Sequence, residues 1–175
     1  MRNIIEEFYE AFSSLDAENM VKYYHPDVVF QDPAFGELKA DRAKNMWRML
    51  CHSQKGKGFK VKYQVIDFNK EKASAQWDAF YTFSQTGRKV HNKIFASFVI
   101  ENGLIMEHID EFNLYNWSKQ AMGIKGYFLG NTSFFRNKLQ QKTNLLLNEF
   151  EEKLSPTKNI VHLADDTVNE DNSNK

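Results

Sequence analysis

Residues 59–65 read Phe59-Lys60-Val61-Lys62-Tyr63-Gln64-Val65, so that apolar and polar side chains alternate one by one. This period of two predicts a β-strand with one buried face. The alternation continues over 73–83, and a third strand is predicted over about 89–100. Asn102-Gly103, a strong hairpin signal, then returns the chain along 104–113. These strands predict a strongly twisted antiparallel meander.

The chain before this meander has the period of a helix. Its first helix has one apolar stripe, formed by Ile4, Ile5, Phe8, Phe12 and Leu15. Asp16 is a good N-cap for a second helix from Ala17 to about Tyr24, and Asp41 is a good N-cap for a third. A short strand, 28–32, lies between these two helices and ends at Pro33. Helices followed by a meander predict an α+β domain.

The chain after the meander predicts a helical extension. Residues 116–122 indicate a short helix closed by Gly123, and Thr132 can cap a long last helix with one apolar stripe. Gly126 and Gly130 have the small-xxx-small spacing, but their segment is far too short to span a membrane. We expect one domain over 1–123, a helical extension packed on it over 124–154, and a disordered polar tail over 155–175.

Composition excludes several classes of protein. The 23 Lys and Arg side chains balance the 23 Asp and Glu side chains. The chain also lacks the basic stripe with interleaved aromatic residues that is typical of nucleic-acid-binding proteins, so no nucleic-acid partner is expected. No stretch approaches the roughly 20 apolar residues of a transmembrane helix, so no membrane partner is expected. Cys51 is the only cysteine and the N-terminus lacks a signal-peptide pattern, which favours a cytoplasmic, bacterial-type location.

Two stretches resemble a known superfamily. They are Tyr23-Tyr24-His25-Pro26-Asp27-Val28-Val29-Phe30-Gln31-Asp32-Pro33 and Asn102-Gly103-Leu104-Ile105-Met106-Glu107-His108-Ile109-Asp110-Glu111-Phe112-Asn113. Together with the order of elements, they resemble the nuclear transport factor 2-like superfamily, and residues 117–123 look like the closing helix of SnoaL-like proteins. The resemblance implies a cone-shaped fold in which a curved sheet and the N-terminal helices enclose a pocket. That superfamily includes ketosteroid isomerases, limonene epoxide hydrolases and polyketide cyclases.

The resemblance also implies site residues. Asp32 falls where the isomerases keep their general base, but Phe8 and Ala96 stand at the positions of their oxyanion donors, so steroid isomerisation is not expected. Asp110 and Asp78 resemble the two carboxylates of the epoxide hydrolases, and Gln76 stands in place of the arginine.

From their strand positions, these polar residues either line a pocket or have an ordinary structural role. His108 and Asp110 share one face of their strand, which we expect to be a pocket floor, and Leu104 and Met106 are expected on that face too. Asp32 alternatively starts a turn, and Asp78 alternatively faces solvent.

The resulting hypothesis is a cofactor-free acid–base enzyme, of isomerase, cyclase or epoxide-hydrolase type, that acts on a small apolar molecule. Asp110 would donate a proton, Asp78 or Asp32 would act as base, and His108 would orient them. Five further residues are predicted to line the ligand pocket: Gln76, Asn92, Tyr24, Trp47 and Met106. No metal site is expected. A non-catalytic module that binds a hydrophobic ligand or a protein partner is the alternative, and a homodimer through the convex face of the sheet is expected in either case.

Overall fold

The computed structural model describes residues 2–155, and the predicted polar tail lies outside this range except for Ser155. In chain order the elements are α1 (Ile4–Ser13), α2 (Ala17–Val21), β1 (Tyr24–Asp32), β2 (Gly36–Lys39), α3 (Ala40–Gln54), β3 (Lys60–Phe68), β4 (Lys72–Phe83), β5 (Arg88–Glu101), β6 (Leu104–Phe112), α4 (Leu114–Met122), α5 (Ile124–Leu129) and α6 (Ser133–Leu154).

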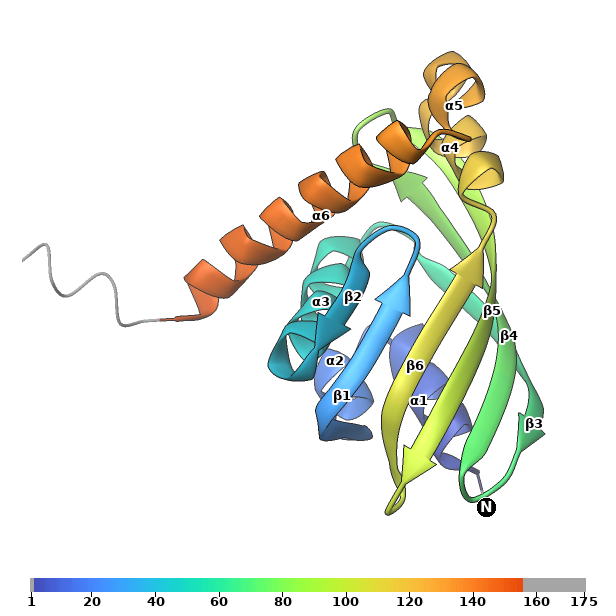
Figure 1. The fold of residues 1–175 in the computed structure, drawn as a ribbon, viewed down its shortest axis with the longest axis vertical. Helices are drawn as coiled ribbons and strands as arrows, with labels where there is room; N and C mark the ends of the chain where they lie inside the picture. The colour runs from blue at the N-terminus through green and yellow to red at the C-terminus, as the bar shows by residue number, and fades with distance from the viewer. Residues whose placement is uncertain (1, 156–175) are drawn as a thin grey trace, which may run out of the picture.

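The six strands form one curved sheet in the order β2-β1-β6-β5-β4-β3 (Figure 1). Strands β3 to β6 make the antiparallel meander, and Asn102 and Gly103 turn the β5–β6 hairpin with positive φ angles. Strand β1 lies parallel to β6 and antiparallel to β2. The predicted α+β cone is therefore confirmed, with a mixed sheet in place of a wholly antiparallel one.

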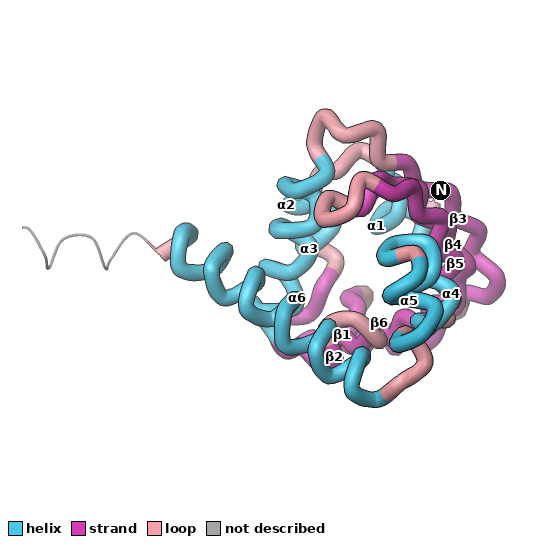
Figure 2. The backbone as a smooth tube through the Cα atoms, turned by 90° about the horizontal axis from the view of Figure 1, so that it is seen from above, coloured by secondary structure: helices cyan, strands magenta, loops and turns pink. Residues whose placement is uncertain are grey.

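Helices α1 to α3 lie on the inner side of the curved sheet (Figure 2). The core between these layers is aromatic: the Phe12 ring of α1 meets the Trp47 ring of α3 and the Trp77 ring of β4 edge to face, at centroid distances of 5.1 and 5.5 Å. Such pairs stabilise a core beyond the apolar area that they bury. The concave face is consequently filled with side chains.

Two local predictions are wrong. Helix α2 ends at Val21, and Tyr24 already belongs to β1, because it pairs with Ile105 of β6. Asp41 does not cap α3: the helix begins at Ala40 after the short strand β2, which was not predicted, and Lys39 occupies the cap position without a side-chain hydrogen bond. In both cases strand pairing overrides the local signal: β1 starts at Tyr24 to pair with the distant β6, and β2 pairs with the preceding β1 as far as Lys39.

Helix α6 packs back across the domain at α3. Its Leu147 side chain is fully buried, and Arg42 of α3 donates hydrogen bonds to Glu151 and to the side-chain oxygen of Asn144. No helix within residues 2–155 is long and apolar enough to cross a membrane.

The convex face of the sheet is mixed in character. It carries Gln76, Asp78 and Lys93 beside Phe95, which is 41% exposed. The homodimer predicted through this face remains a prediction.

Candidate functional site

A chain of hydrogen bonds runs through the buried interior between α3 and β4. The Trp47 indole N–H donates to the Tyr24 hydroxyl at 2.7 Å, and this hydroxyl lies 2.7 Å from His108 Nδ1. His108 Nε2 lies 3.0 Å from Asp110 Oδ1, which also accepts the Trp77 indole N–H at 3.1 Å. His108 is 0% and Asp110 4% exposed, so all of these polar groups are satisfied inside the protein.

The donors along this chain fix the positions of its protons. An indole nitrogen can only donate, so the Tyr24 oxygen accepts from Trp47 and directs its own hydrogen to His108 Nδ1. A neutral His108 then carries its hydrogen on Nε2 and donates it to Asp110. Every hydrogen bond of the chain is thus directed toward the Asp110 carboxylate.

Five aromatic rings pack against His108, of which Tyr24, at a centroid distance of 6.1 Å, also hydrogen-bonds to it. The centroids of the other four lie 4.3 Å (Phe98), 5.2 Å (Phe30), 5.6 Å (Phe8) and 5.9 Å (Trp47) from the centroid of the imidazole. His108 and Asp110 share one face of β6, as predicted, but in this conformation that face is a packed floor without solvent access.

Asp32 lies next to Asp110 on the neighbouring strand. Strands β1 and β6 are parallel, and Phe30 of β1 pairs with His108 of β6. Asp32 and Asp110 each follow these paired residues by two positions, so they lie alongside each other on the concave face. Burial raises the pKa of Asp32 to about 7, the negative charge of Asp110 adds to this rise, and hydrogen bonds from backbone amides oppose it. At neutral pH this carboxyl group can therefore either donate or accept a proton.

The turn after β1 holds the Asp32 side chain, which also has the turn-starting role that the sequence allowed. Its Oδ1 accepts the backbone N–H groups of Ala34 at 2.9 Å and Phe35 at 2.6 Å. Helix α6 holds the same turn by hydrogen bonds to the carbonyl groups of the turn. Three side chains of α6 donate them: Gln140 to Pro33, Thr143 to Ala34 and Asn144 to Phe35. The helical extension thus contributes to the position of Asp32.

Two tyrosines that the sequence analysis did not single out also belong to this region. The Tyr9 hydroxyl is buried without a hydrogen-bond partner, and burial, followed by the charge of Asp110, raises the pKa of Tyr9 well above its usual value. Tyr81 accepts the Trp117 indole N–H at 2.7 Å. Burial raises the pKa of Tyr81, and the charge of Asp32 adds to this rise. Tyr9 follows Ile5 by one helical turn, which was the available signal for its inward position.

A cavity of about 410 Å³ lies at the mouth of the cone, next to the Asp32 turn. Phe35, Tyr81 and Trp117 are among the residues that line it. Its other walls are formed by α3, by α6 and by residues 82–85 at the end of β4. The helices contribute mostly apolar side chains, which include Met49, Leu50, Leu139, Leu146 and Phe150, and the charged groups Lys142, Glu149 and Lys153. An apolar cavity with a few polar groups is typical of a small-molecule site.

Asp78 is not part of this site. Trp77 faces α1, so the next residue of the strand points to the convex face. There Asp78 Oδ1 lies 2.6 Å from His91 Nε2, and its side chain is 34% exposed. The expectation that Asp78 and Asp110 share one cavity is therefore wrong. Gln76 is also on the convex face and lines a shallow depression together with Asp78.

The remaining predicted pocket residues have different positions. Tyr24 and Trp47 belong to the buried hydrogen-bond chain. Asn92 lines a surface depression beside Asn113 and Lys119, away from His108. Met106 lies where the β5–β6 register shifts, and Ile105 takes the fully buried position instead. A one-residue bulge reverses the faces of the residues before it, so Met106 and Leu104 do not extend the row of His108 and Asp110.

No cluster of three or more His, Cys, Asp or Glu side chains suited to a metal ion occurs in the part of the chain that the structure describes.

The model of one protein family matches residues 5–108, which is more than half of the 175-residue chain; its description is SnoaL-like domain. The matched segment runs from α1 to His108 and includes Asp32. No curated protein sequence matches the chain.

Several solved structures have a similar fold. A candidate polyketide cyclase from Xanthomonas campestris pv. campestris is 15% identical, with a TM-score of 0.55, and the alignment covers 67% of this chain and 93% of that one. TerC co-crystallised with polyporic acid is 16% identical, with a TM-score of 0.56 and coverages of 67% and 95%. An LEH-like epoxide hydrolase from M. tuberculosis is 18% identical, with a TM-score of 0.50 and coverages of 75% and 92%.

Proposed function

Because the chain belongs to the SnoaL-like domain family, we propose that it is a cofactor-free acid–base enzyme that binds a small apolar molecule in the cavity at the mouth of the cone. The proton-transfer group is Asp32. The observation that carries this proposal is a carboxyl group with a pKa of about 7, held in a turn whose residues Ala34 and Phe35 line the cavity.

The arrangement of carboxylates favours one class of reaction. Asp110 accepts two hydrogen bonds inside the protein and lies beside Asp32, whose pKa its charge helps to raise. With one carboxyl group of raised pKa beside the cavity, the site would remove a proton from a substrate and return it elsewhere, as in isomerisation or aldol-type cyclisation. Epoxide opening in the manner of the hydrolases needs a second carboxylate in the same cavity, and Asp78 lies on the other face.

The roles within this mechanism differ from those expected from the sequence. Asp32 takes the place of Asp110 as the group that exchanges protons with the substrate, and His108 with Tyr24 holds the Asp110 carboxylate. Tyr81, which lines the cavity and whose pKa responds to the charge of Asp32, can donate a hydrogen bond to a substrate oxygen.

The experiment that tests this proposal is proton exchange in D₂O. Small enolisable ketones and aromatic polyketide-like substrates would be incubated with the protein, and loss of the proton next to the carbonyl group would be followed by NMR. We expect exchange to depend on pH with an inflection near 7, and Asp32→Asn to slow it by at least about 100-fold. Asp78→Asn is the matched control and is expected to leave the rate unchanged.

A binding module is the second candidate, because His108, the group expected to orient the catalytic acids, is packed among five aromatic rings and is 0% exposed. TerC was co-crystallised with polyporic acid, which supports a small-molecule ligand in either case. If ligands from the screen bind with equal affinity to the parent protein and to Asp32→Asn, and no exchange is detected, the protein binds without catalysing this reaction.

A further inference from the structure

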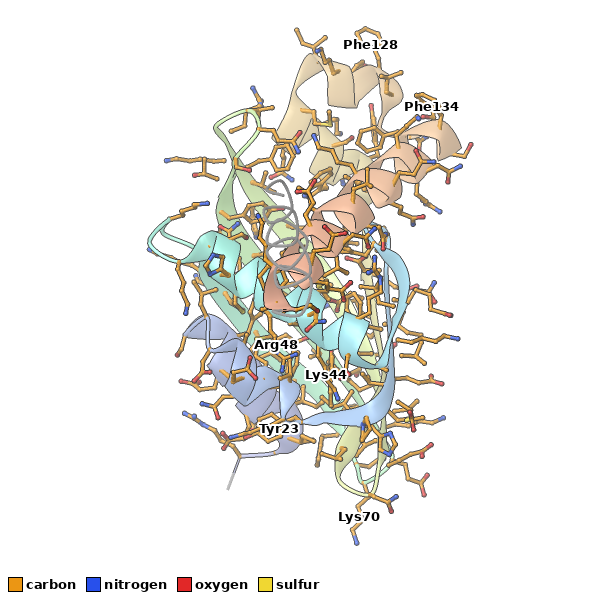
Figure 3. All side chains as sticks on the ribbon, turned by 90° about the vertical axis from the view of Figure 1, so that its left-hand side faces the viewer. Tyr23, Lys44, Arg48, Lys70, Phe128 and Phe134 are labelled. Carbon is orange, nitrogen blue, oxygen red and sulfur yellow. The ribbon has the colours of Figure 1, made fainter. Side chains whose placement is uncertain are left out.

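An apolar surface projects from the end of the molecule formed by α4, α5 and the start of α6. Its side chains, here named the apolar tip, are Ile124, Tyr127, Phe128 and Leu129 of α5 and Phe134 of α6, which are 78%, 59%, 73%, 48% and 62% exposed. Figure 3 shows Phe128 and Phe134 near one end of the molecule and Lys70 at the other. Groups of exposed large apolar side chains mark interaction sites on protein surfaces.

The packing of α5 explains why these side chains face outward. An amphipathic surface helix normally turns its apolar side chains toward the protein. In α5, Gly126 and the following Gly130 form the inner face, and a Cβ atom at either position would overlap Ser118 of α4. Ser118 Oγ also donates to the Gly126 carbonyl oxygen at 3.0 Å. The small residues thus occupy the contact with the protein, and the large apolar ones remain on the outside.

The segment that forms the apolar tip carries charges of a single sign. Residues 112–148 include five basic residues and no Asp or Glu, although the whole chain has a net charge of zero. Lys125, Arg136 and Lys138 are exposed beside the tip. The β4–β5 hairpin adds Arg88, whose guanidinium group lies next to Gly123 and donates to the Gln120 carbonyl oxygen at 2.8 Å.

We propose that the apolar tip is a docking surface for an anionic lipid bilayer. The aromatic and aliphatic side chains would enter the headgroup region while the surrounding cations contact acidic headgroups, which is the pattern of proteins that lie on a membrane without crossing it. This proposal replaces the expectation from the sequence that the protein has no membrane partner, which rested on the lack of a spanning segment and did not consider the surface of α5. A second copy of the chain fits this surface poorly, because two identical cationic surfaces would face each other.

Vesicle co-sedimentation of the full chain tests this proposal. The probes are vesicles of phosphatidylcholine with about 30% phosphatidylserine and vesicles of phosphatidylcholine alone. We expect the protein to bind the anionic vesicles. Binding should weaken as the salt concentration rises toward about 0.5 M, roughly three times the physiological ionic strength, because salt screens the surface charges. Lys125→Gln should lower the partition coefficient about fivefold, and Phe128→Ser should lower it at least about tenfold.

Two controls separate a specific surface from general stickiness. Ile66→Ser removes an apolar side chain that is 51% exposed on β3, and it is expected to leave partition unchanged. Circular dichroism would show that each variant keeps its fold. The proposal would be overturned if the protein bound neutral vesicles as strongly as anionic ones, or if Ile66→Ser lowered the partition coefficient as much as Phe128→Ser. Binding to an oligonucleotide instead of vesicles would also overturn it. None of these results depends on the acid–base proposal for Asp32.

Discussion

Asp32 and Asp110 occupy corresponding positions on parallel strands, each two residues beyond the paired Phe30 and His108. They are the same residue type in two different environments. Asp110 accepts the side-chain donors of His108 and Trp77, whereas Asp32 accepts two backbone amides of its own turn. Asp32, whose turn borders the cavity, is the carboxyl group with the pKa near 7, and this difference supports the proposed role of Asp32 in proton transfer.

Asp32 should make the stability of the protein depend on pH. The folded pKa, about 7, lies above the usual 3.8, so between these values the folded protein retains a proton that the unfolded chain has lost. The free energy of unfolding therefore falls as pH rises from about 4 to about 7. Asp32→Asn removes this slope and should be the more stable protein at pH 8, by at most about 4 kcal/mol. Urea denaturation of both proteins across this range measures the difference, and parallel curves would contradict it.

Asp110 and Asp78 should differ sharply when each is replaced by asparagine. In Asp110→Asn, an amide group replaces an acceptor of two buried donors, so we expect a loss of about 2–4 kcal/mol in the free energy of unfolding. Asp78 is partly exposed beside His91, and Asp78→Asn should cost less than about 1 kcal/mol. Denaturation at pH 7 compares the two variants. Equal losses would show that the convex-face pair is as important to folding as the buried one.

The elements of the fold could be predicted because their signals are local. Alternation over 59–65 and 73–83 and the Asn102-Gly103 turn are visible without knowledge of any partner strand. The parallel pairing of β1 with β6 could not be seen in this way, since it joins residues such as Phe30 and His108 that are distant in sequence.

The candidate site was predictable in part. The inward face of His108 and Asp110 follows from the period of two, and the same rule, applied to the buried Trp77, would have placed Asp78 on the opposite face. The bulge at Met106 leaves no mark in the sequence. The contacts of α6 with the Asp32 turn depend on tertiary packing alone.

Tyr9 and Tyr24 offer a matched pair of Tyr→Phe substitutions, since both are 3% exposed or less. Tyr24→Phe breaks two hydrogen bonds and leaves the Trp47 N–H and His108 Nδ1 without a partner, so it should cost about 2–3 kcal/mol of stability. Tyr9→Phe removes a hydroxyl that has no partner and should be neutral or stabilising by up to about 1 kcal/mol. Thermal denaturation tests the contrast, and a large loss in Tyr9→Phe would reveal a bound water or another partner of its hydroxyl.

The predicted dimer can be tested through Phe95. This large hydrophobic side chain is 41% exposed and lines the convex depression together with Gln76 and Lys93. If two copies pair through this face, light scattering at tens of micromolar should give twice the monomer mass, and Phe95→Lys should return the monomer. A monomeric parent protein would contradict the prediction.

Helix α6 should influence Asp32 through Asn144. This side chain donates to the Phe35 carbonyl oxygen at 2.9 Å and accepts from Arg42, so Asn144→Ala should lower the free energy of unfolding by about 1–2 kcal/mol. A looser turn admits water to Asp32, which should shift its pKa from about 7 toward the ordinary value, because burial is the main cause of the rise. NMR titration of the aspartate carboxyl carbons measures this shift. Asn148→Ala, on an exposed position of the same helix, is the control. If both variants titrate like the parent protein, α6 supports the fold without affecting the site.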